Sequence, residues 1–496
     1  MPGQDPRREL RQDPGAAEMK LTELPEARGT WKFFDLICST PHPSGGERKL
    51  AALLADKARE AGLHVRTDSF GNLRIDRAPA PGFEARPGII LQAHLDMVPQ
   101  KRGGSTFDFA KDPLPVRVEG NKVHCGGETT LGADDGIGAA LAMDMLTDPE
   151  VECGPLAGLF TLEEEIGLNG ARALAPAFLE GKFLINLDSG CDSCFYAGCA
   201  GGVEDYGHFT PQYRNAPAGN AFRIALRGLL GGHSGSEIHR KRGNAHKFLA
   251  AFLKSLGGAV AVSSIAGGSV VNAISRESEA VVVSSLSADE LRAQAEKFAA
   301  TLEEHFDAPE NFGFDVTPCP APEKVWDTAF QTTFLDMLTA LPDGVLEFAE
   351  ELDSVRTSCN LGIIRNAPDG KIVVGLHPRS FDDAAWQELS SRICEIFRKF
   401  GGMPEEQRPY TGWKFDPDSR LLAAARETFR ELTGKMLPVR AIHAGLETGL
   451  FAPMAPELEM ISFAPASWNE HTTEEYLEIG SVTVVSRWLR RLVMRF

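Results

Sequence analysis

Residues 131–148, LGADDGIGAALAMDMLTD, place two adjacent aspartates between glycines at the head of an apolar segment. The segment 136–148 has the pattern of a buried helix. It is preceded by GIILQAHLDMV (88–98) and followed by LAGLFTLEEE (156–165), which both have the pattern of strands. Strands separated by helices are typical of a mainly parallel sheet. These residues therefore predict an α/β fold.

The same alternation extends outward in both directions. ERKLAALLADKAREA (47–61) predicts an amphipathic helix, and KFLINLD (182–188) predicts a further strand. Near the carboxyl end, LEMISFAP predicts a strand and IGSVTVVSRWLRRLVMRF (479–496) a closing helix. We therefore expect a discontinuous sheet domain, residues 19–205 and 404–496, with helices on both faces of its sheet.

Between these two parts the pattern changes. Segments 270–298 and 359–397 each give a strand, a turn, a strand and a helix, which indicates a weak internal β-β-α duplication. Ser287 and Ser380 each stand before a pair of acids at the start of the predicted helix, as helix-capping residues do. Residues 206–403 are therefore predicted to form an inserted α+β domain.

Composition limits the classes of function. A chain of 496 residues exceeds what one hydrophobic core usually supports. Its formal charge of −18 disfavours nucleic acid and anionic membrane surfaces as partners. No apolar stretch approaches the length of a membrane span. Residues 1–18 lack the apolar region of a signal peptide and are expected to be a disordered extension.

Cysteine usage indicates the compartment. The nine cysteines are an odd number scattered along the chain, which favours reduced thiols and a cytoplasmic location. Cys191 and Cys194 form a C-x-x-C pair. A redox or zinc role for this pair is the minor alternative, because no second pair stands at zinc-site spacing.

Acidic and histidine side chains cluster at the ends of predicted strands. Each has a simpler explanation when taken alone: Asp134 could cap the following helix, and His443 could be an ordinary core or surface residue. Together, at the carboxyl ends of strands in one sheet, they supply the ligands that zinc or manganese prefers. A carboxylate shared between two such ions would explain the buried aspartates. The candidate residues are His94, Asp96, Asp134, Asp135, Glu163, Glu164, Glu165, Asp188 and His443.

Several motifs in order carry a family resemblance: AHLDMV, TTLGADDGIG, EEEIGLNGA, INLDSG, GCAGG, GGHSG and HAGLETGLF. From about residue 30 onward the chain resembles the metallopeptidases related to carboxypeptidase G2. Within them it is most similar to the aminoacyl-histidine dipeptidases (Xaa-His dipeptidases, peptidase D type). The resemblance implies a zinc-peptidase-like sheet domain with an inserted lid domain.

The resemblance also implies a site with two divalent metal ions. Zinc is the first choice, with manganese or cobalt as alternatives. His94 and Asp188 would bind one ion, Glu165 and His443 would bind the other, and Asp134 would bridge them.

Further roles follow from the same resemblance. Glu164 would be the general base for a metal-activated water, and Asp96 would hold the His94 imidazole from behind. His233, in GGHSG of the lid, would donate to the tetrahedral oxyanion. Asn272 and Arg379 would bind the free carboxylate of a peptide, Arg379 being the stronger candidate.

One segment departs from the family pattern. Where relatives commonly carry Ala-His-Ser-Pro before an acid, this chain has WNEHTTEE, which contains His471 but no Ser-Pro. The departure puts the preference for a C-terminal histidine in doubt more than it does hydrolysis.

The sequence therefore predicts a metal-dependent hydrolase of short unblocked peptides, most simply Xaa-His-type dipeptides, acting as a homodimer through the lid domain. The alternatives within the family are a tripeptide aminopeptidase and an N-acyl amino-acid deacylase. The alternative outside enzymes is an inactive metal- or peptide-binding homologue, which the retention of Glu164 disfavours.

Overall fold

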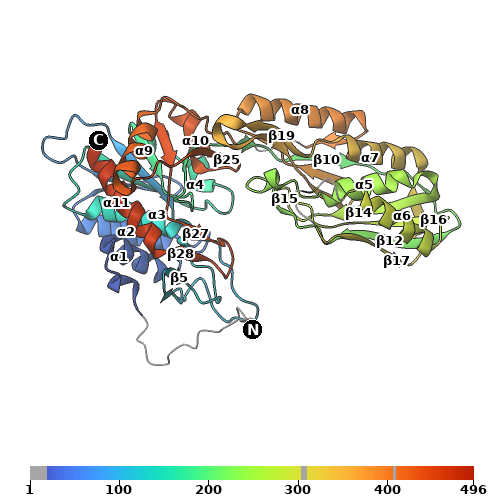
Figure 1. Ribbon diagram of the computed structural model, residues 1–496, viewed down its shortest axis with the longest axis horizontal. Helices are drawn as coiled ribbons and strands as arrows, with labels where there is room; N and C mark the ends of the chain where they lie inside the picture. The colour runs from blue at the N-terminus through green and yellow to red at the C-terminus, as the bar shows by residue number, and fades with distance from the viewer. Residues whose placement is uncertain (1–18, 303–305, 307–309, 406–408) are drawn as a thin grey trace, which may run out of the picture. The chain divides into compact units, whose positions relative to one another are not determined.

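The computed structural model describes residues 19–302, 306, 310–405 and 409–496 (Figure 1). The expected disordered extension, 1–18, lies outside the described residues. The chain divides into two compact units. Unit 1 comprises the described residues up to Phe195, Ser419–Pro438 and Glu457–Phe496; unit 2 comprises Tyr196–Asp418 and Val439–Pro456.

Unit 1 contributes the strands β1-β2-β6-β3-β7-β26 to an eight-stranded sheet, whose order continues with β8 and β25. Strands β6, β3, β7 and β26 are parallel to one another, and β2 runs antiparallel to both of its neighbours, β1 and β6. The strands of unit 1 are β1 (His64–Thr67), β2 (Leu73–Arg77), β3 (Ile89–His94), β4 (Arg117–Glu119), β5 (Lys122–His124), β6 (Leu156–Thr161), β7 (Phe183–Asn186), β26 (Glu459–Ser462), β27 (Ser467–Trp468) and β28 (Tyr476–Glu478). Its helices are α1 (Arg28–Cys38), α2 (Arg48–Glu60), α3 (Ala133–Thr147), α4 (Asn169–Ala173), α9 (Arg420–Thr433) and α11 (Ile479–Arg495).

The central strands are buried on both faces. Every residue of β3, β6 and β7 is buried, as expected where helices cover both sides of a parallel sheet. Helix α3 packs on β3 and on α1, and nearly all of its side chains are buried. The predicted α/β fold is confirmed, and the helix begins at Ala133, so that both aspartates lie in its first turn.

Unit 2 contains an antiparallel sheet in the order β17-β12-β16-β14-β21-β22-β10-β24. Helices α5 to α8 share one apolar core with this sheet (Figure 1). Its strands are β8 (Phe195–Cys199, which starts at the unit boundary), β9 (Gly201–Gly202), β10 (Asp205–Phe209), β11 (Tyr213–Asn215), β12 (Asn220–Arg227), β13 (Gly232–His233), β14 (Val260–Gly267), β15 (Ala273–Ile274), β16 (Ser278–Ser284), β17 (Gly313–Pro318), β18 (Lys324–Trp326), β19 (Gly344–Ala349), β20 (Ser354–Cys359), β21 (Leu361–Asn366), β22 (Ile372–Leu376), β23 (Arg379–Ser380), β24 (Met403–Pro404) and β25 (Val439–Ile442). Its helices are α5 (Ala245–Ser255), α6 (Ala288–Ala300), α7 (Thr328–Ala340), α8 (Asp383–Lys399) and α10 (Glu447–Met454).

One of the two predicted helix caps is in place. Ser287 accepts the backbone N–H of Glu290, whose carboxylate returns to the Ser287 N–H, and this capping box starts α6. Helix α8 is capped instead by Asp382, which accepts the N–H of Ala384. Ser380 lies in β23 and accepts the N–H of Asp382, so the prediction placed this cap two residues too early.

Unit 2 is larger than the predicted insertion, 206–403. Residues 439–456 group with unit 2, where Ser354 Oγ donates to the carbonyl of Ala441, although β25 is also the last strand of the sheet that begins with β1. Among the described residues no helix has the length and apolarity needed to cross a membrane.

Candidate active site

Four segments of unit 1 carry four of the five predicted metal ligands. His94 ends β3, the glutamates 163–165 follow β6, and Asp188 follows β7. Because β3, β6 and β7 are parallel and adjacent, their carboxyl ends meet at one edge of the sheet. Asp134, in the first turn of α3, reaches the same place, since its carboxylate contacts His94.

Asp134 lies between two imidazoles. Its Oδ1 is 3.0 Å from His94 Nε2, and its Oδ2 is 3.1 Å from His471 Nε2. Asp188 Oδ1 is 3.5 Å from the same His94 nitrogen, Nε2, and Glu165 Oε1 is 2.9 Å from His471 Nε2. The side chains therefore form two groups of three that share Asp134, and within each group the ligand atoms lie within 4.8 Å of one another. A carboxylate with one oxygen toward each group has the geometry of a bridging ligand.

The structure corrects one predicted ligand. The histidine beside Glu165 is His471, not His443. His443 lies in unit 2, where its Nε2 is 2.7 Å from Ser358 Oγ, and it is in none of the candidate metal groups found among the described residues. As predicted, His443 directly follows a strand of the sheet, β25, but its Nε2 contacts Ser358 rather than a carboxylate of the candidate groups.

Asp96 organises the two neighbouring loops. Its Oδ1 is 3.5 Å from His94 Nδ1, and its backbone carbonyl is 3.0 Å from the same nitrogen. The carboxylate also accepts the backbone N–H groups of Glu164 and Glu165, at 2.9 and 3.2 Å. The side chain expected behind His94 thus also fixes the backbone that carries both glutamates.

A second buried carboxylate anchors the loop before Asp134. Glu475 accepts the N–H groups of Leu131, Gly132 and Ala133 at 2.7, 3.2 and 2.8 Å. Gly132 has a φ of +65°, and a Cβ there would lie 2.9 Å from the sulfur of Met97, so this tight turn requires glycine. The turn holds Asp134 at the strand ends.

The acids that the sequence left outside the site have structural partners. Asp135 is buried and accepts the backbone N–H of His94. Glu163 adopts a positive φ and accepts a hydrogen bond from Asn169 Nδ2, while Glu164 Oε lies in a candidate group with His94 and Glu165. Glu164, and not Glu163, therefore stands beside the candidate metal ligands.

The electrostatic field of the site is negative. Burial opposes the charged form of His94, but the carboxylates of Asp188 and Asp134 outweigh burial and hold its pKa well above the usual value. Hydrogen bonds to Asp134 and Glu165 raise the pKa of His471 to about 11. Burial raises the pKa of Asp188 well above its usual range.

The donor set fits a pair of divalent cations. Two imidazole nitrogens and three carboxylates converge, which are ligands for zinc and manganese, and no thiol takes part in the candidate groups among the described residues. Two dications would offset the negative field that raises the pKa of both imidazoles.

Unit 2 carries the predicted oxyanion donor, His233, in β13. Its Nδ1 accepts the N–H groups of Gly235 and Ser236 at 3.2 and 3.1 Å. A neutral imidazole that accepts at Nδ1 carries its proton at Nε2. The loop therefore fixes His233 in the tautomer that donates from Nε2.

Asn272 lies beside His233. Strand β13 pairs with β15, and the carbonyl of Asn272 accepts the N–H of Ser234 at 2.8 Å. The Asn272 side chain is exposed.

Arg379 is a buried cation. It is 4% exposed; its Nη1 donates to Tyr410 Oη at 2.7 Å and its Nη2 is 3.4 Å from His377 Nδ1. Within the described ranges no carboxylate forms an ion pair with Arg379, and its buried Nε has no hydrogen-bond partner. A buried guanidinium without a counter-ion is suited to bind an anionic group of a ligand.

Burial, reinforced by Arg379, lowers the pKa of His377 well below its usual value and that of His443 to about 3. Both imidazoles are therefore neutral at pH 7, and neither competes with Arg379 as a positive charge.

Three important residues were missed from the sequence. His471 and Glu475 lie in a segment that departs from the family pattern, and their adjacency to residues 131–134 is a long-range contact without local periodicity. Tyr410, which accepts a hydrogen bond from Arg379, lies in none of the motifs that the sequence analysis singled out.

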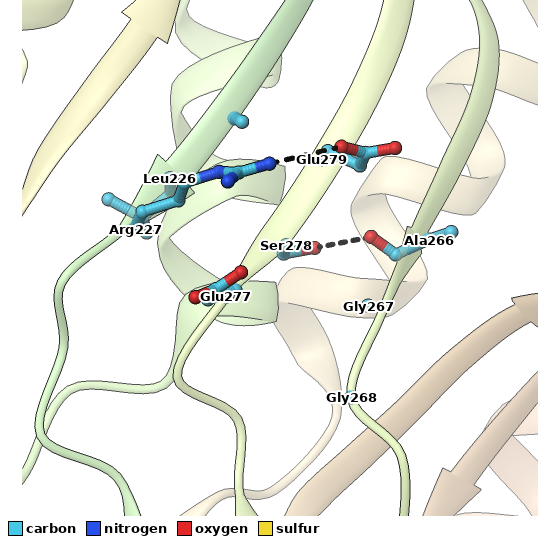
Figure 2. A pocket seen from close by; sticks show the side chains of 9 residues that line it. Leu226, Arg227, Ala266, Gly267, Gly268, Glu277, Ser278 and Glu279 are labelled. Atoms are coloured by element: carbon cyan, nitrogen blue, oxygen red, sulfur yellow. Dashed lines mark hydrogen bonds and ion pairs between the residues drawn. The ribbon is translucent and has the colours of Figure 1, made fainter.

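A separate cavity of about 250 Å³ lies on β12, β14 and β16 of unit 2 (Figure 2). Arg227 and Glu279 form an ion pair of 3.8 Å beside it, and Ser278 Oγ donates to the carbonyl of Ala266. None of the predicted site residues is among the residues that line this cavity.

Comparisons with known proteins show the family of the chain. Residues 90–495 match the family model "Peptidase family M20/M25/M40". The cytosol non-specific dipeptidase of Escherichia coli is 36% identical over 91% of this chain and 94% of its own length.

Solved structures give the same relationship. The crystal structure of an aminoacylhistidine dipeptidase from Vibrio alginolyticus is 34% identical, covers 96% of this chain and 97% of its own, and superposes with a TM-score of 0.83. A tripeptidase from Staphylococcus aureus, at 14% identity and a TM-score of 0.55 over 94% and 98% of the two chains, shares the fold.

Proposed function

The chain belongs to peptidase family M20/M25/M40 and is a metallopeptidase, and from this premise we propose that it hydrolyses unblocked dipeptides, Xaa-His dipeptides among them. The observation that carries the proposal is the division of Asp134 between two groups of ligands, with Glu164 beside them. The two relatives that are more than 30% identical over nearly the whole chain are described as dipeptidases, which favours short peptides over the alternatives in the family.

The proposed ligands of one ion are His94, Asp134 and Asp188, and those of the other are Asp134, Glu165 and His471. Zinc suits this mixed set of imidazole and carboxylate ligands best, and manganese is the alternative. Two such ions supply Lewis acidity, which polarises the scissile carbonyl and makes water a stronger acid.

The proposed role of Glu164 is to move a proton. Its carboxylate takes a proton from the attacking water and gives it to the amine that leaves. Asp96 keeps Glu164 in place through its bond to the Glu164 N–H, and holds His94 at the same time. The proton transfer thus depends on a backbone that one buried carboxylate fixes.

Residues of unit 2 complete the proposal. His233 donates from Nε2 to the oxyanion of the tetrahedral intermediate. Arg379, whose charge has no carboxylate counter-ion among the described residues, binds the free carboxylate of the dipeptide, with Asn272 as a further polar contact. A peptide with a blocked or distant carboxylate would lose this pairing.

We further propose a cytoplasmic location and a homodimer formed through unit 2. The location is supported by the description of the Escherichia coli relative as cytosolic and by nine cysteines that are all thiols. A monomeric mass in analytical ultracentrifugation at micromolar concentration would contradict the dimer.

The test is an assay of the purified protein, loaded with zinc or manganese, against Xaa-His dipeptides, other free dipeptides, a tripeptide and an N-acetyl amino acid. We expect cleavage of the free dipeptides, loss of cleavage on chelation, and a loss of at least about 10²-fold in kcat for Glu164→Gln at unchanged metal content. Preferred cleavage of the tripeptide or the N-acetyl compound would replace the dipeptidase proposal with that activity.

A further inference from the structure

The loop that links β7 to β8 carries the C-x-x-C pair, which the proposed reaction does not use. Cys191 Sγ and Cys194 Sγ are 3.7 Å apart. Cys191 is half-buried, whereas Cys194 is only 1% exposed. The side chain of Cys191 is thus partly accessible to a reagent, whereas the side chain of Cys194 next to it is buried.

The neighbours of Cys191 favour its reactive form. Ser193 Oγ is 3.1 Å from Cys191 Sγ. Hydrogen bonds from Cys194 and Ser193 lower the pKa of Cys191 to about 5. A thiolate with hydrogen-bond donors, partial exposure and a second thiol nearby is the arrangement found in reactive cysteine pairs.

The other cysteines lack this combination. Six of the nine are buried, Cys194 among them, and Cys319 and Cys394 are half-buried like Cys191. Within the described residues, no hydrogen bond or sulfur contact joins Cys319 or Cys394 to another cysteine. The two provide an internal control for non-specific oxidation.

We propose that Cys191 and Cys194 form a redox modification site. Low-molecular-weight disulfides oxidise the two thiols to an intramolecular disulfide. The thiolate of Cys191 attacks one sulfur of the small disulfide; the S–S bond breaks, and one small thiol leaves with a proton. Cys194 then loses its proton and attacks Cys191 Sγ, which releases the second small thiol. Two protein thiols are oxidised and one small disulfide is reduced to two thiols, so the step is reversible.

Formation of the disulfide changes the loop beside the proposed metal centre. The two sulfurs must approach from 3.7 Å to about 2.05 Å, which moves a loop that begins directly after Asp188. The loop is tied to its surroundings: Asp192 accepts from Ser481 Oγ at 2.6 Å, and the carbonyl of Gly190 accepts the N–H of Ser467 at 3.2 Å. A Cβ on Gly190 would lie 2.2 Å from Glu470, the neighbour of His471. The loop therefore lies between the proposed ligands Asp188 and His471, and we infer that formation of the disulfide loosens metal binding.

The disulfide is tested on the full-length, metal-loaded protein in glutathione buffers from about −300 to −150 mV. Thiols are alkylated in denaturant and counted by mass. We expect two fewer alkylated cysteines in the oxidised protein, one cross-linked peptide containing Cys191 and Cys194, and full reversal by excess reduced glutathione. Uniform alkylation of all nine cysteines across the series, or a cross-link elsewhere, would overturn the proposal.

Single variants distinguish the order of attack. Cys194→Ser should accumulate one mixed disulfide with glutathione at Cys191, because no second thiol resolves it. In Cys191→Ser, no mixed disulfide with glutathione should form at Cys194. Cys394→Ser, the matched control, should still form the cross-link. Absence of the mixed disulfide in Cys194→Ser would contradict the assignment of Cys191 as the attacking sulfur.

The effect on the metal centre rests on the proposed function and is measured separately. Transfer of zinc from the protein to a chromophoric chelator should be several-fold faster after oxidation of the natural sequence, and unaffected by the same treatment of Cys191→Ser. Equal transfer rates before and after oxidation would refute the effect of the disulfide on metal binding. The disulfide itself would still be established by the mass of the cross-linked peptide. A protein that forms the cross-link but binds no zinc would refute the metal centre instead.

Discussion

Asp134 shows how much of the site depends on one side chain. It offers an oxygen to each of two imidazoles, and its sequence context, two acids between glycines before a helix, was the feature from which the bridging role was predicted. The residue that completes the second group could not be found in the same way. His471 meets Asp134 across 337 positions of chain, and no periodicity or spacing encodes a contact of that kind.

The distinction between the two histidines leads to a prediction about single residues. His471→Ala should lose about half of the bound metal, because one of the two ligand groups loses its imidazole. His443→Ala should keep the full metal content, since its Nε2 contacts Ser358. Metal content by atomic emission after gel filtration checks both, and the opposite result would restore His443 as the ligand.

Arg379 gives a second prediction at this scale. Arg379→Lys should raise KM for a free dipeptide by about 10-fold or more and leave the KM for its C-terminal amide nearly unchanged, because only the free carboxylate pairs with the guanidinium fork. Steady-state kinetics on the two substrates measure the ratio. Equal effects on both substrates would show that Arg379 supports structure alone.

Secondary-structure elements were predicted well where burial determines the pattern. The fully buried strands β3, β6 and β7 and the closing helix α11 lie within or close to their predicted ranges, because continuous apolar runs leave little choice. Some short elements were not predicted: β13 and β23 have two residues each and are set by their partners. The cap of α8 shifted from Ser380 to Asp382 because Ser380 pairs in β23.

The start of α6 yields a prediction for an element. Ser287→Ala removes the acceptor for the Glu290 N–H and breaks the capping box, which should cost about 1 kcal/mol of stability. Urea unfolding followed by circular dichroism measures the change. Ser380→Ala serves as the matched control for α8, whose cap is Asp382, and an equal loss there would contradict the assigned caps.

The contact between β10 and α8 predicts a dependence of stability on pH. Burial raises the pKa of Asp205 from 3.8 to about 7, although Ser390 donates to its Oδ1. The folded protein therefore holds a proton that the unfolded chain releases above pH 3.8, so this group lowers stability progressively as the pH rises from about 4 to about 7. Below that window both states are protonated and the group costs nothing.

Asp205→Asn removes this titration. As the pH rises from about 4 to about 7, the variant should become more stable relative to the natural sequence by up to about 1.4 kcal/mol per pH unit in free energy of unfolding. Above about pH 7 the difference between the two proteins should stay constant. Urea titrations at pH 5, 6, 7 and 8 give the slope. Parallel pH profiles of the two proteins would show that Asp205 titrates normally.

At the scale of the whole molecule, the division into two units predicts the response to metal removal. All residues in the candidate metal groups of the described chain belong to unit 1. Ligands stabilise only the structure that binds them. Chelation should therefore lower the calorimetric Tm of one transition and leave a second unchanged, and a uniform shift of all transitions would show that the units unfold together.

Sequence alone predicted an inserted domain, but it did not predict that residues 439–456 group with unit 2 while their strand, β25, joins the sheet that begins with β1, because such a division depends on long-range contacts.

The path of the chain has a consequence for biosynthesis. The polypeptide passes between the two units four times, and β26, a parallel partner of β7, and His471 both come from the last segment of unit 1. A ribosome that has produced the first 400 residues has therefore released neither a complete parallel sheet nor a full set of proposed ligands. The nascent chain cannot acquire its metal pair until nearly all of it has been translated, so peptide-bond cleavage cannot begin on the ribosome.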